Sequence, residues 1–231
     1  MTNSNGGYGQ FCPVSMAAEL VCTRWTINVI RELLQGSSRF NDLRRGLPRM
    51  SPALLSKRLK ELEAGGIIER TGTQGQGGVT YVLTPAGNAL GDVVESIGRW
   101  GHRWLETHLS LQNLDPSLLM WDMRRRLNPD PMPPGRAVIQ FVYPELSATR
   151  RQWWLLVDKG KDVDLCSIDP GFDVNLYVVT ALRTMTSIWM GLSTLEEELN
   201  RHTVRLTGDA ALQQSMSQWL GLNHFAKAER H

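Results

Sequence analysis

Positive charge is concentrated between residues 36 and 60. This segment holds seven basic residues and a single acidic one, Asp42; the basic residues are Arg39, Arg44, Arg45, Arg49, Lys57, Arg58 and Lys60. The net charge of the whole chain is only +2, so the positive charge is local. Such a focused charge is what a phosphate-binding surface requires. A solvated helix face is the alternative that the charge pattern alone leaves open.

A helix beginning at Ser51 is expected to present part of this charge. Ser51 is a good N-cap and Pro52 suits the first helical position, where its missing N–H costs nothing. Apolar residues recur at helical spacing up to about residue 64, where Gly65-Gly66 ends the pattern; they are Leu54, Leu55, Leu59 and Leu62. If the leucines face a core, helical geometry turns Ala53, Ser56, Lys57 and Lys60 outward. Small and basic side chains on that face suit a helix in the DNA major groove.

The neighbouring segments predict the order of a winged helix-turn-helix. Three helices are expected over residues 13–22, 25–34 and 40–45, before the helix of residues 51–64. Strands over 67–70 and 79–83 enclose a Gly-rich loop, 71–78, and a helix of residues 84–108 follows. In this order the 51–64 helix is the recognition helix and the 71–78 loop is the wing. We therefore predict contacts to double-stranded DNA from Arg39, Arg49, Ser51, Ala53, Ser56, Lys57, Arg58, Lys60, Gln74 and Gln76.

Two features of this surface leave alternatives. Arg58 lies at the flank of the apolar face, so it could reach a DNA phosphate or pair with Glu61 or Glu63 inside the domain. The glycines of loop 71–78 resemble a phosphate-binding loop, but such loops lead from a strand into a helix, whereas this one joins two strands. The loop carries no Lys or Arg, which weakens the expectation of strong phosphate contacts by the wing.

Residues 12–105 carry a series of short motifs in order. These are Cys12-Pro13-Val14, Trp25-Thr26, RFNDLR at 39–44, Met50-Ser51-Pro52, LSKRLKELE at 55–63, GIIER at 66–70, YVLTPAG at 81–87 and Trp100-Gly101. On these motifs the segment resembles the HxlR-type winged-helix transcriptional regulators, a bacterial family. The resemblance implies a homodimer formed through helix 13–22 and helix 84–108, which reads an operator with two half-sites. The apolar stripe of the 84–108 helix agrees, because one domain cannot bury all of it.

Cys12 occupies the position of the family's cysteine, which in some members senses oxidants or aldehydes. A reactive thiol needs a lowered pKa, usually from basic neighbours, and no Lys or Arg lies within ten residues of Cys12. We therefore expect an ordinary buried or boundary thiol, with a thiol sensor as the alternative.

The second half of the chain has a different composition. The Pro-rich segment 128–134 indicates a connector, and Arg124-Arg125-Arg126 reads as a solvated helix face or linker contact. Strands are expected over 137–143, 152–157, 164–168 and 173–179, with a last strand over 202–206 and helices over 180–190, 195–199 and 209–219. Strands in meander order followed by helices predict a sheet with helices on one face. Met and Trp residues gather where helix meets sheet, which suits an adaptable apolar cavity or plain core packing.

Residues 136–225 resemble the sterol carrier protein fold, a five-stranded sheet covered by helices around an apolar lipid tunnel. The resemblance rests on FDVNL at 172–176, Trp189-Met190-Gly191, Leu199, VRLTGD at 204–209, Leu212 and Trp219-Leu220. It implies a small apolar ligand bound by Leu182, Met185, Trp189, Met216 and Trp219, and it carries over no catalytic residue. The extra Trp residues depart from a generic lipid carrier and could narrow the tunnel.

Composition excludes several classes of protein. The chain has 231 residues, of which 42% are hydrophobic and 21% charged, as expected of a globular protein. No apolar run is long enough for a membrane helix, and the polar N-terminal residues do not resemble a secretory signal, so a cytoplasmic protein is expected. The three cysteines and five histidines show no metal-ligand spacing, and no metal or cofactor is expected.

The predicted fold class is α+β. An N-terminal arm (1–12) precedes a winged helix-turn-helix domain (13–110), a helical and Pro-rich connector (111–135) and a sterol-carrier-like domain (136–231). The function expected is a non-enzymatic, homodimeric transcriptional regulator whose DNA binding responds to an apolar effector. The alternative is a lipid or acyl-chain carrier, or accessory protein, whose N-terminal half only dimerises.

Overall fold

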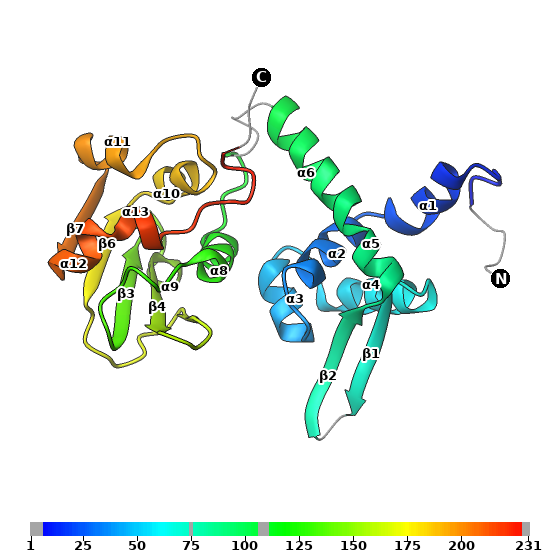
Figure 1. Cartoon of the computed structure of the whole chain (residues 1–231), viewed down its shortest axis with the longest axis horizontal. Helices are drawn as coiled ribbons and strands as arrows, with labels where there is room; N and C mark the ends of the chain where they lie inside the picture. Colours follow the sequence, from blue (N-terminus) through cyan, green and yellow to red (C-terminus); the bar gives the residue numbers. More distant parts are fainter. Residues whose placement is uncertain (1–6, 74–75, 106–110, 228–231) are drawn as a thin grey trace. The chain divides into compact units, whose positions relative to one another are not determined.

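The computed structural model describes residues 7–73, 76–105 and 111–227, with no side-chain detail for residues 73–77. The chain forms two compact units, Met1–Gly98 and Arg99–His231, each with its own hydrophobic core. The first unit is helical with a two-stranded sheet, and the second contains a five-stranded sheet (Figure 1). The architecture is therefore α+β. The division lies within the helix Gly91–Trp104, whereas the sequence predicts that the first domain ends at residue 110. The predicted domain boundaries remain predictions.

The first unit follows the predicted order of elements. These are α1 (Pro13–Val21), α2 (Thr26–Leu34), α3 (Phe40–Gly46), α4 (Pro52–Ala64), β1 (Ile68–Thr73), β2 (Gln76–Leu83), α5 (Pro85–Ala89) and α6 (Gly91–Trp104), which continues past Gly98 into the second unit. The helices α2, α3 and α4 enclose the core, in which Val29, Ile30, Leu43, Leu55 and Leu59 are almost completely buried.

Helix α4 begins and ends as its sequence indicates. The hydroxyl of Ser51 accepts a hydrogen bond from the backbone N–H of Leu54 at 3.3 Å, and Pro52 occupies the first turn. Such a cap satisfies one of the N–H groups that a helix start leaves without a partner. At the other end, Gly66 adopts a φ of +68°, a conformation that favours glycine. The helix is therefore delimited by local chemistry.

Two predictions about the end of this unit are wrong in detail. The loop expected over 71–78 is shorter, because β1 and β2 continue to Thr73 and Gln76, which pair with each other. The single helix expected over 84–108 is two helices, α5 and α6, with a turn at Leu90. The short α5 lies close against the chain before β1, since a Cβ on Gly87 would lie 2.1 Å from the carbonyl oxygen of Ile67. Residues 106–108 lie outside the described residues.

The second unit places helices against a mixed sheet. Its elements are α8 (Pro116–Arg126), β3 (Arg136–Val142), α9 (Ala148–Arg151), β4 (Gln152–Asp158), β5 (Asp164–Cys166), β6 (Leu176–Thr180), α10 (Leu182–Trp189), α11 (Leu195–Asn200), β7 (Val204–Gly208), α12 (Ala210–Gln214) and α13 (Met216–Trp219). Alternate residues of β3 join the core cluster with residues from α8, α10, α12 and α13. The observed strands β3, β4 and β5 agree closely with the predicted strands, whereas β6 begins at Leu176 instead of residue 173.

The order of the strands differs from the predicted meander. The sheet runs β5-β4-β3-β6-β7, and β6 pairs with β3 in parallel, while all the other pairs are antiparallel. The connection from β5 to β6 therefore passes β4 and β3. A meander needs a tight turn between neighbouring strands, but nine residues separate Cys166 from Leu176. Which strand β6 pairs with depends on contacts distant in sequence, which strand periodicity cannot reveal.

The segment expected to be a connector contains a core helix. In α8, Leu119, Met120 and Met123 are buried in the core of the second unit. The guanidinium of Arg124 lies 4.0 Å from the centre of the Trp121 ring, and that of Arg125 lies 5.0 Å from it. The expectation of a solvated face is therefore wrong for these two arginines, because a buried indole attracts them. The predicted closing helix also differs, since it divides into α12 and α13 at Ser215.

Candidate nucleic-acid interface

The outward face of α4 carries the small and basic residues that its sequence indicated. Ala53, Ser56, Lys57 and Lys60 are all exposed, whereas Leu55 and its partners on the opposite face are buried. The Lys57 side chain is 68% exposed, and its ammonium lies 3.9 Å from the carboxylate of Glu61. An exposed ion pair of this kind is weak, so it leaves the lysine able to meet a phosphate. The face is therefore accessible, and its contact with DNA remains a prediction.

Further basic side chains lie on the elements before α4. Arg39 is the exposed residue at the start of α3, and Arg49 is exposed in the turn between α3 and α4. Arg44 and Arg45 are also exposed, and Arg45 lies 3.6 Å from Asp42. The structure thus places these residues in the helix-turn-helix region formed by α3 and α4. Their role in DNA binding remains a prediction.

Arg58 takes the internal alternative that its position left open. The residue is 9% exposed, and its Nε donates to the carbonyl oxygen of Arg24 at 3.1 Å. Its guanidinium also pairs with the carboxylate of Glu61. These partners favour the internal alternative, and a direct DNA contact by Arg58 remains a prediction. Periodicity placed Arg58 at the flank of the core, but the carbonyl that binds it comes from 34 residues earlier in the chain.

The β1–β2 ribbon projects from the helices as a wing would (Figure 1). The hydroxyls of Thr71 and Thr80 lie 2.7 Å apart across the two strands. Gln74 lies outside the described residues, and Gln76 begins β2 in a stretch whose side chains are not described. Both contacts therefore stay predictions.

These features define a winged helix-turn-helix: a capped helix with a basic outward face, held by two other helices and followed by an antiparallel ribbon. Residues 20–109 match the model of the HxlR-like helix-turn-helix family. The transcriptional regulator YvaP of Bacillus subtilis is 33% identical over 99 residues, which cover 42% of this chain and 92% of YvaP. The chain belongs to this family. It is accordingly a DNA-binding transcriptional regulator.

Another Bacillus subtilis protein gives a similar match. The transcriptional regulator YodB is 34% identical over 97 residues, covering 41% of this chain and 87% of YodB. The solved structure of reduced YodB covers 42% of this chain and 97% of its own, at 33% identity and a TM-score of 0.37. Both relatives therefore match less than half of the present chain.

Cys12 is an exposed thiol at the start of α1, not the buried or boundary thiol that we expected. The backbone N–H groups of Ser15 and Val14 lower the pKa of this thiol. A helix N-terminus is a known cause of such a shift, independent of basic neighbours. The sequence signal was the Cys-Pro pair, because proline favours the first turn of a helix and so places the cysteine at its cap.

The residues expected to bind an apolar ligand gather in the second unit. Leu182, Met185 and Trp189 lie on α10, Met216 and Trp219 on α13, and all five are buried in one core cluster. The indole N–H of Trp219 donates to the carbonyl oxygen of Leu212 at 2.9 Å. The structure thus brings the five side chains together, and ligand binding by them remains a prediction.

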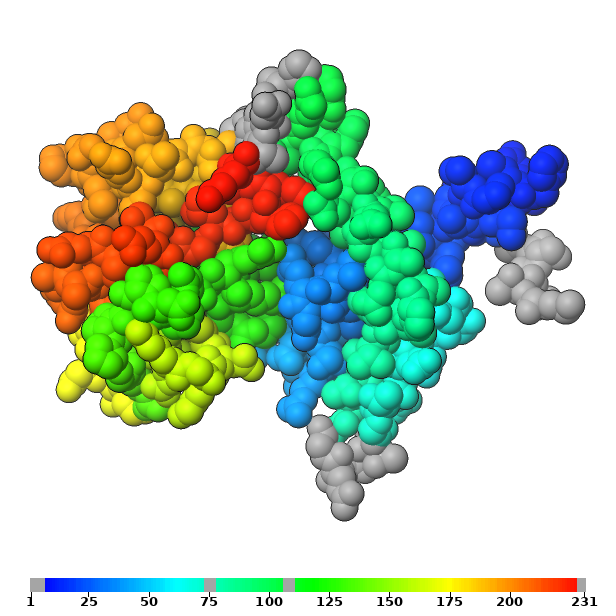
Figure 2. All heavy atoms as spheres, in the orientation of Figure 1, coloured from blue at the N-terminus to red at the C-terminus, as the bar shows by residue number. Residues whose placement is uncertain are grey.

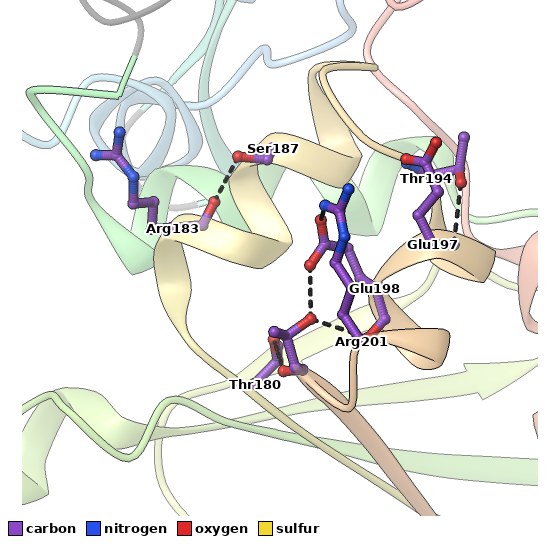
Figure 3. Close-up of polar contacts among 8 residues, drawn as sticks. Thr180, Arg183, Ser187, Thr194, Glu197, Glu198 and Arg201 are labelled. Carbon is purple, nitrogen blue, oxygen red and sulfur yellow. Dashed lines mark hydrogen bonds and ion pairs between the residues drawn. The ribbon is translucent and has the colours of Figure 1, made fainter.

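A polar group beside this core was not anticipated from the sequence. Glu198 of α11 is 7% exposed, and the hydroxyl of Thr203 donates to its carboxylate at 2.5 Å. Arg201 lies 3.1 Å from the same carboxylate, and Thr180 of β6 donates to the carbonyl oxygen of Thr203 (Figure 3). The hydrogen bond from Thr203, together with the positive charge of Arg201, holds the pKa of Glu198 below its ordinary value. The network ties α11 to the sheet.

Two features are absent from the part of the chain that the structure describes. Within residues 7–73, 76–105 and 111–227, no group of three or more His, Cys, Asp or Glu side chains could hold a metal ion. Among the helices of the described part of the chain, none is both long and apolar enough to cross a membrane.

Proposed function

We propose that the protein is a homodimeric regulator that reads an operator of two half-sites through α4 and responds to an apolar ligand in its second unit. DNA binding and transcriptional regulation follow from membership of the family. The dimer, the residues that contact DNA and the ligand are the proposal. The observation that carries it is the pairing of a basic, exposed α4 face with α6, on which no residue is buried although apolar side chains repeat along one side.

Helix α6 supports the homodimer. None of its residues is buried, although Val93, Ile97, Trp100 and Trp104 repeat along one side of the helix. Trp100 is 58% exposed and Trp104 is 54% exposed. Figure 2 shows the side chains of α6, in green, at the surface of the molecule. An apolar stripe of this kind marks an interaction site, and a second copy covers it with the same residues.

Helix α1 adds a second apolar surface. Val21 is its one buried residue, while Val14 and Met16 are exposed, as is Phe11 just before the helix. A twofold dimer built on α1 and α6 would place two copies of α4 about 34 Å apart, one turn of DNA. Gel shifts with duplexes selected from random sequence by the wild-type protein test this reading. Operators lacking any repeated half-site would contradict it.

An apolar effector is supported by the resemblance of the second unit to the sterol carrier protein fold. The unit has the five-stranded sheet and the helices that this resemblance implies, and its Met and Trp side chains cluster under α10 and α13. To regulate DNA binding, the effector must bind one dimer geometry more tightly than another, since equal affinity would shift nothing.

The ligand can be tested on the full-length protein with oleate as the probe. A ligand that binds the folded state raises the melting temperature by mass action and should change operator affinity in the same concentration range. A higher melting temperature with unchanged operator affinity would separate binding from regulation. No shift across a panel of fatty acids and native lipid extract would leave a packed core with a structural role.

The carrier alternative is less well supported, because residues 20–109 match a family of DNA-binding regulators. A regulator should bind selected DNA with an affinity that falls steeply with salt, since phosphate contacts release counterions. A carrier would copurify with lipid and show no sequence preference.

Cys12 is proposed as a thiol sensor in this regulator. Its exposure and lowered pKa support reactivity, and its position on α1 would link modification to the proposed dimer surface. Alkylation at neutral pH should be faster at Cys12 than at Cys22, a second exposed cysteine that serves as the control. Equal rates for the two thiols would contradict the proposal.

A further inference from the structure

Arg58 joins the recognition helix to the turn that follows α1. Its Nε donates to the carbonyl oxygen of Arg24 at 3.1 Å. Arg24 lies between the end of α1 at Val21 and the start of α2 at Thr26. The guanidinium therefore bridges two elements with different tasks: α4 faces the DNA, and the turn carries α1.

The turn that accepts this hydrogen bond has a defined shape. Trp25 has a φ of 78°, in the left-handed region that non-glycine residues rarely adopt. The backbone N–H of Thr26 donates to the carbonyl oxygen of Thr23 at 3.0 Å, which closes the turn. Such a conformation persists only where the surroundings hold it, and the hydrogen bond from Arg58 is one of the contacts that do so.

A second contact joins α4 to α1 itself. Gly65, the C-cap of α4, lies against α1, because a Cβ built on Gly65 would be 2.7 Å from Cδ1 of Leu20. Leu20 is only partly buried, and α1 has Val21 as its one buried residue. The direction of α1 relative to α4 therefore depends on a few contacts near residues 20–24.

We propose that Arg58 is a positioning residue for operator recognition: it fixes the angle between α4 and α1 and thereby the half-site spacing that the dimer reads. The inference rests on the proposed homodimer, in which α1 meets the second copy. Leucine packing beneath α4 is not directional and tolerates small rotations, whereas a hydrogen bond to a carbonyl fixes both distance and angle. Loss of that bond should loosen the geometry.

The test measures affinity as a function of half-site spacing. A duplex selected by the wild-type protein is rebuilt with one or two base pairs inserted or deleted between its half-sites, which displaces each half-site by about 3.4 Å per base pair. Wild-type protein should prefer its own spacing by about tenfold or more over a one-base-pair change. Arg58→Met, which keeps an unbranched apolar side chain, should reduce this preference to about threefold or less.

Two variants serve as matched controls. Lys57→Ala removes an outward cation and should weaken binding about equally at every spacing, as loss of a phosphate contact does. Glu61→Gln removes the ion pair with Arg58 but leaves the bond to Arg24, so it should keep the wild-type spacing preference. Denaturant unfolding of each variant confirms that the domain is folded at the assay temperature.

Each outcome decides the inference. A folded Arg58→Met protein that keeps the wild-type spacing ratio, or that loses affinity uniformly as Lys57→Ala does, would overturn it. If Arg58→Met does not fold, Gly65→Ala decides instead, because its methyl group displaces Leu20 at the second contact; an unchanged spacing ratio in that variant also overturns the inference. If the wild-type protein shows no spacing preference, the proposed dimer that reads two half-sites is wrong. This result would be known before any variant is made.

Discussion

Substitution of Trp100 by Ala should dissociate the proposed dimer. Trp100 exposes 58% of its surface, about 140 Å² for a tryptophan of about 240 Å². At about 25 cal/mol per Å², its burial by a second copy is worth about 3.5 kcal/mol per protomer and about 7 kcal/mol per dimer. Association recovers only part of such an area, so we expect a loss of about half that value. This loss corresponds to a dimer Kd raised by at least about 100-fold.

The assay is sedimentation velocity over a dilution series, with operator affinity measured in parallel. Ile168→Ala is the control, since Ile168 is an exposed apolar residue of the second unit, 80% exposed and outside α6. Trp100→Ala should sediment as a monomer at concentrations where wild type and Ile168→Ala are dimers. It should also bind the operator more weakly, because two half-sites no longer act together. A wild-type protein that is monomeric throughout, or equal effects of the two substitutions, would refute the assignment of α6 as the dimer surface.

Three further predictions concern single side chains. Lys57→Ala and Lys60→Ala should each weaken operator binding by about 1 kcal/mol and lower its salt dependence, whereas Cys166→Ala should do neither. Wild-type affinity in both lysine variants would contradict the assignment of α4 as the recognition helix. Ser51→Ala should lower the free energy of unfolding by about 1 kcal/mol, measured with denaturant, because it removes the cap of α4; an unchanged midpoint would contradict this. The lowered pKa of Glu198 stabilises the fold above the unfolded-state pKa of about 4.5, and this stabilisation is lost as pH falls through the folded-state pKa. Glu198→Gln should therefore be less stable than wild type at pH 7, and the difference should shrink on acidification; a constant or growing difference would exclude the mechanism.

Local chemistry made most of the first unit predictable. Ser51 and Pro52 mark the start of α4, and the spacing of its leucines sets the inward face, so the exposed positions of Lys57 and Lys60 followed directly. Residue spacing does not assign side chains at the edge of the apolar face of a helix. Arg58 could not be assigned from its spacing alone, since its partner Arg24 lies in another element. The helix break at Leu90 was missed, although Gly91 stands directly after it, because the continuous apolar spacing favours one helix and the close packing of Gly87 on Ile67 appears only in the fold.

The second unit shows where such reasoning ends. Strand positions followed from apolar periodicity, but the pairing of β6 with β3 did not, because it joins segments far apart in sequence. The sequence predicts a solvated Arg124. In the folded chain its guanidinium lies over the ring of the buried Trp121. Glu198 has no sequence signal of its own beyond the Thr194–Glu197 capping box next to it.

The sequence by itself determined the boundaries of α4, the order of elements in the DNA-binding unit, its basic outward face and the family to which it belongs. These properties depend on capping, periodicity and charge within short stretches of chain. The tertiary structure decided the internal role of Arg58, the strand order of the sheet, the place of α8 in the core and the exposure of the Cys12 thiol. Those properties depend on which distant segments meet, and hydrogen bonds and burial between such segments form only when the chain is folded.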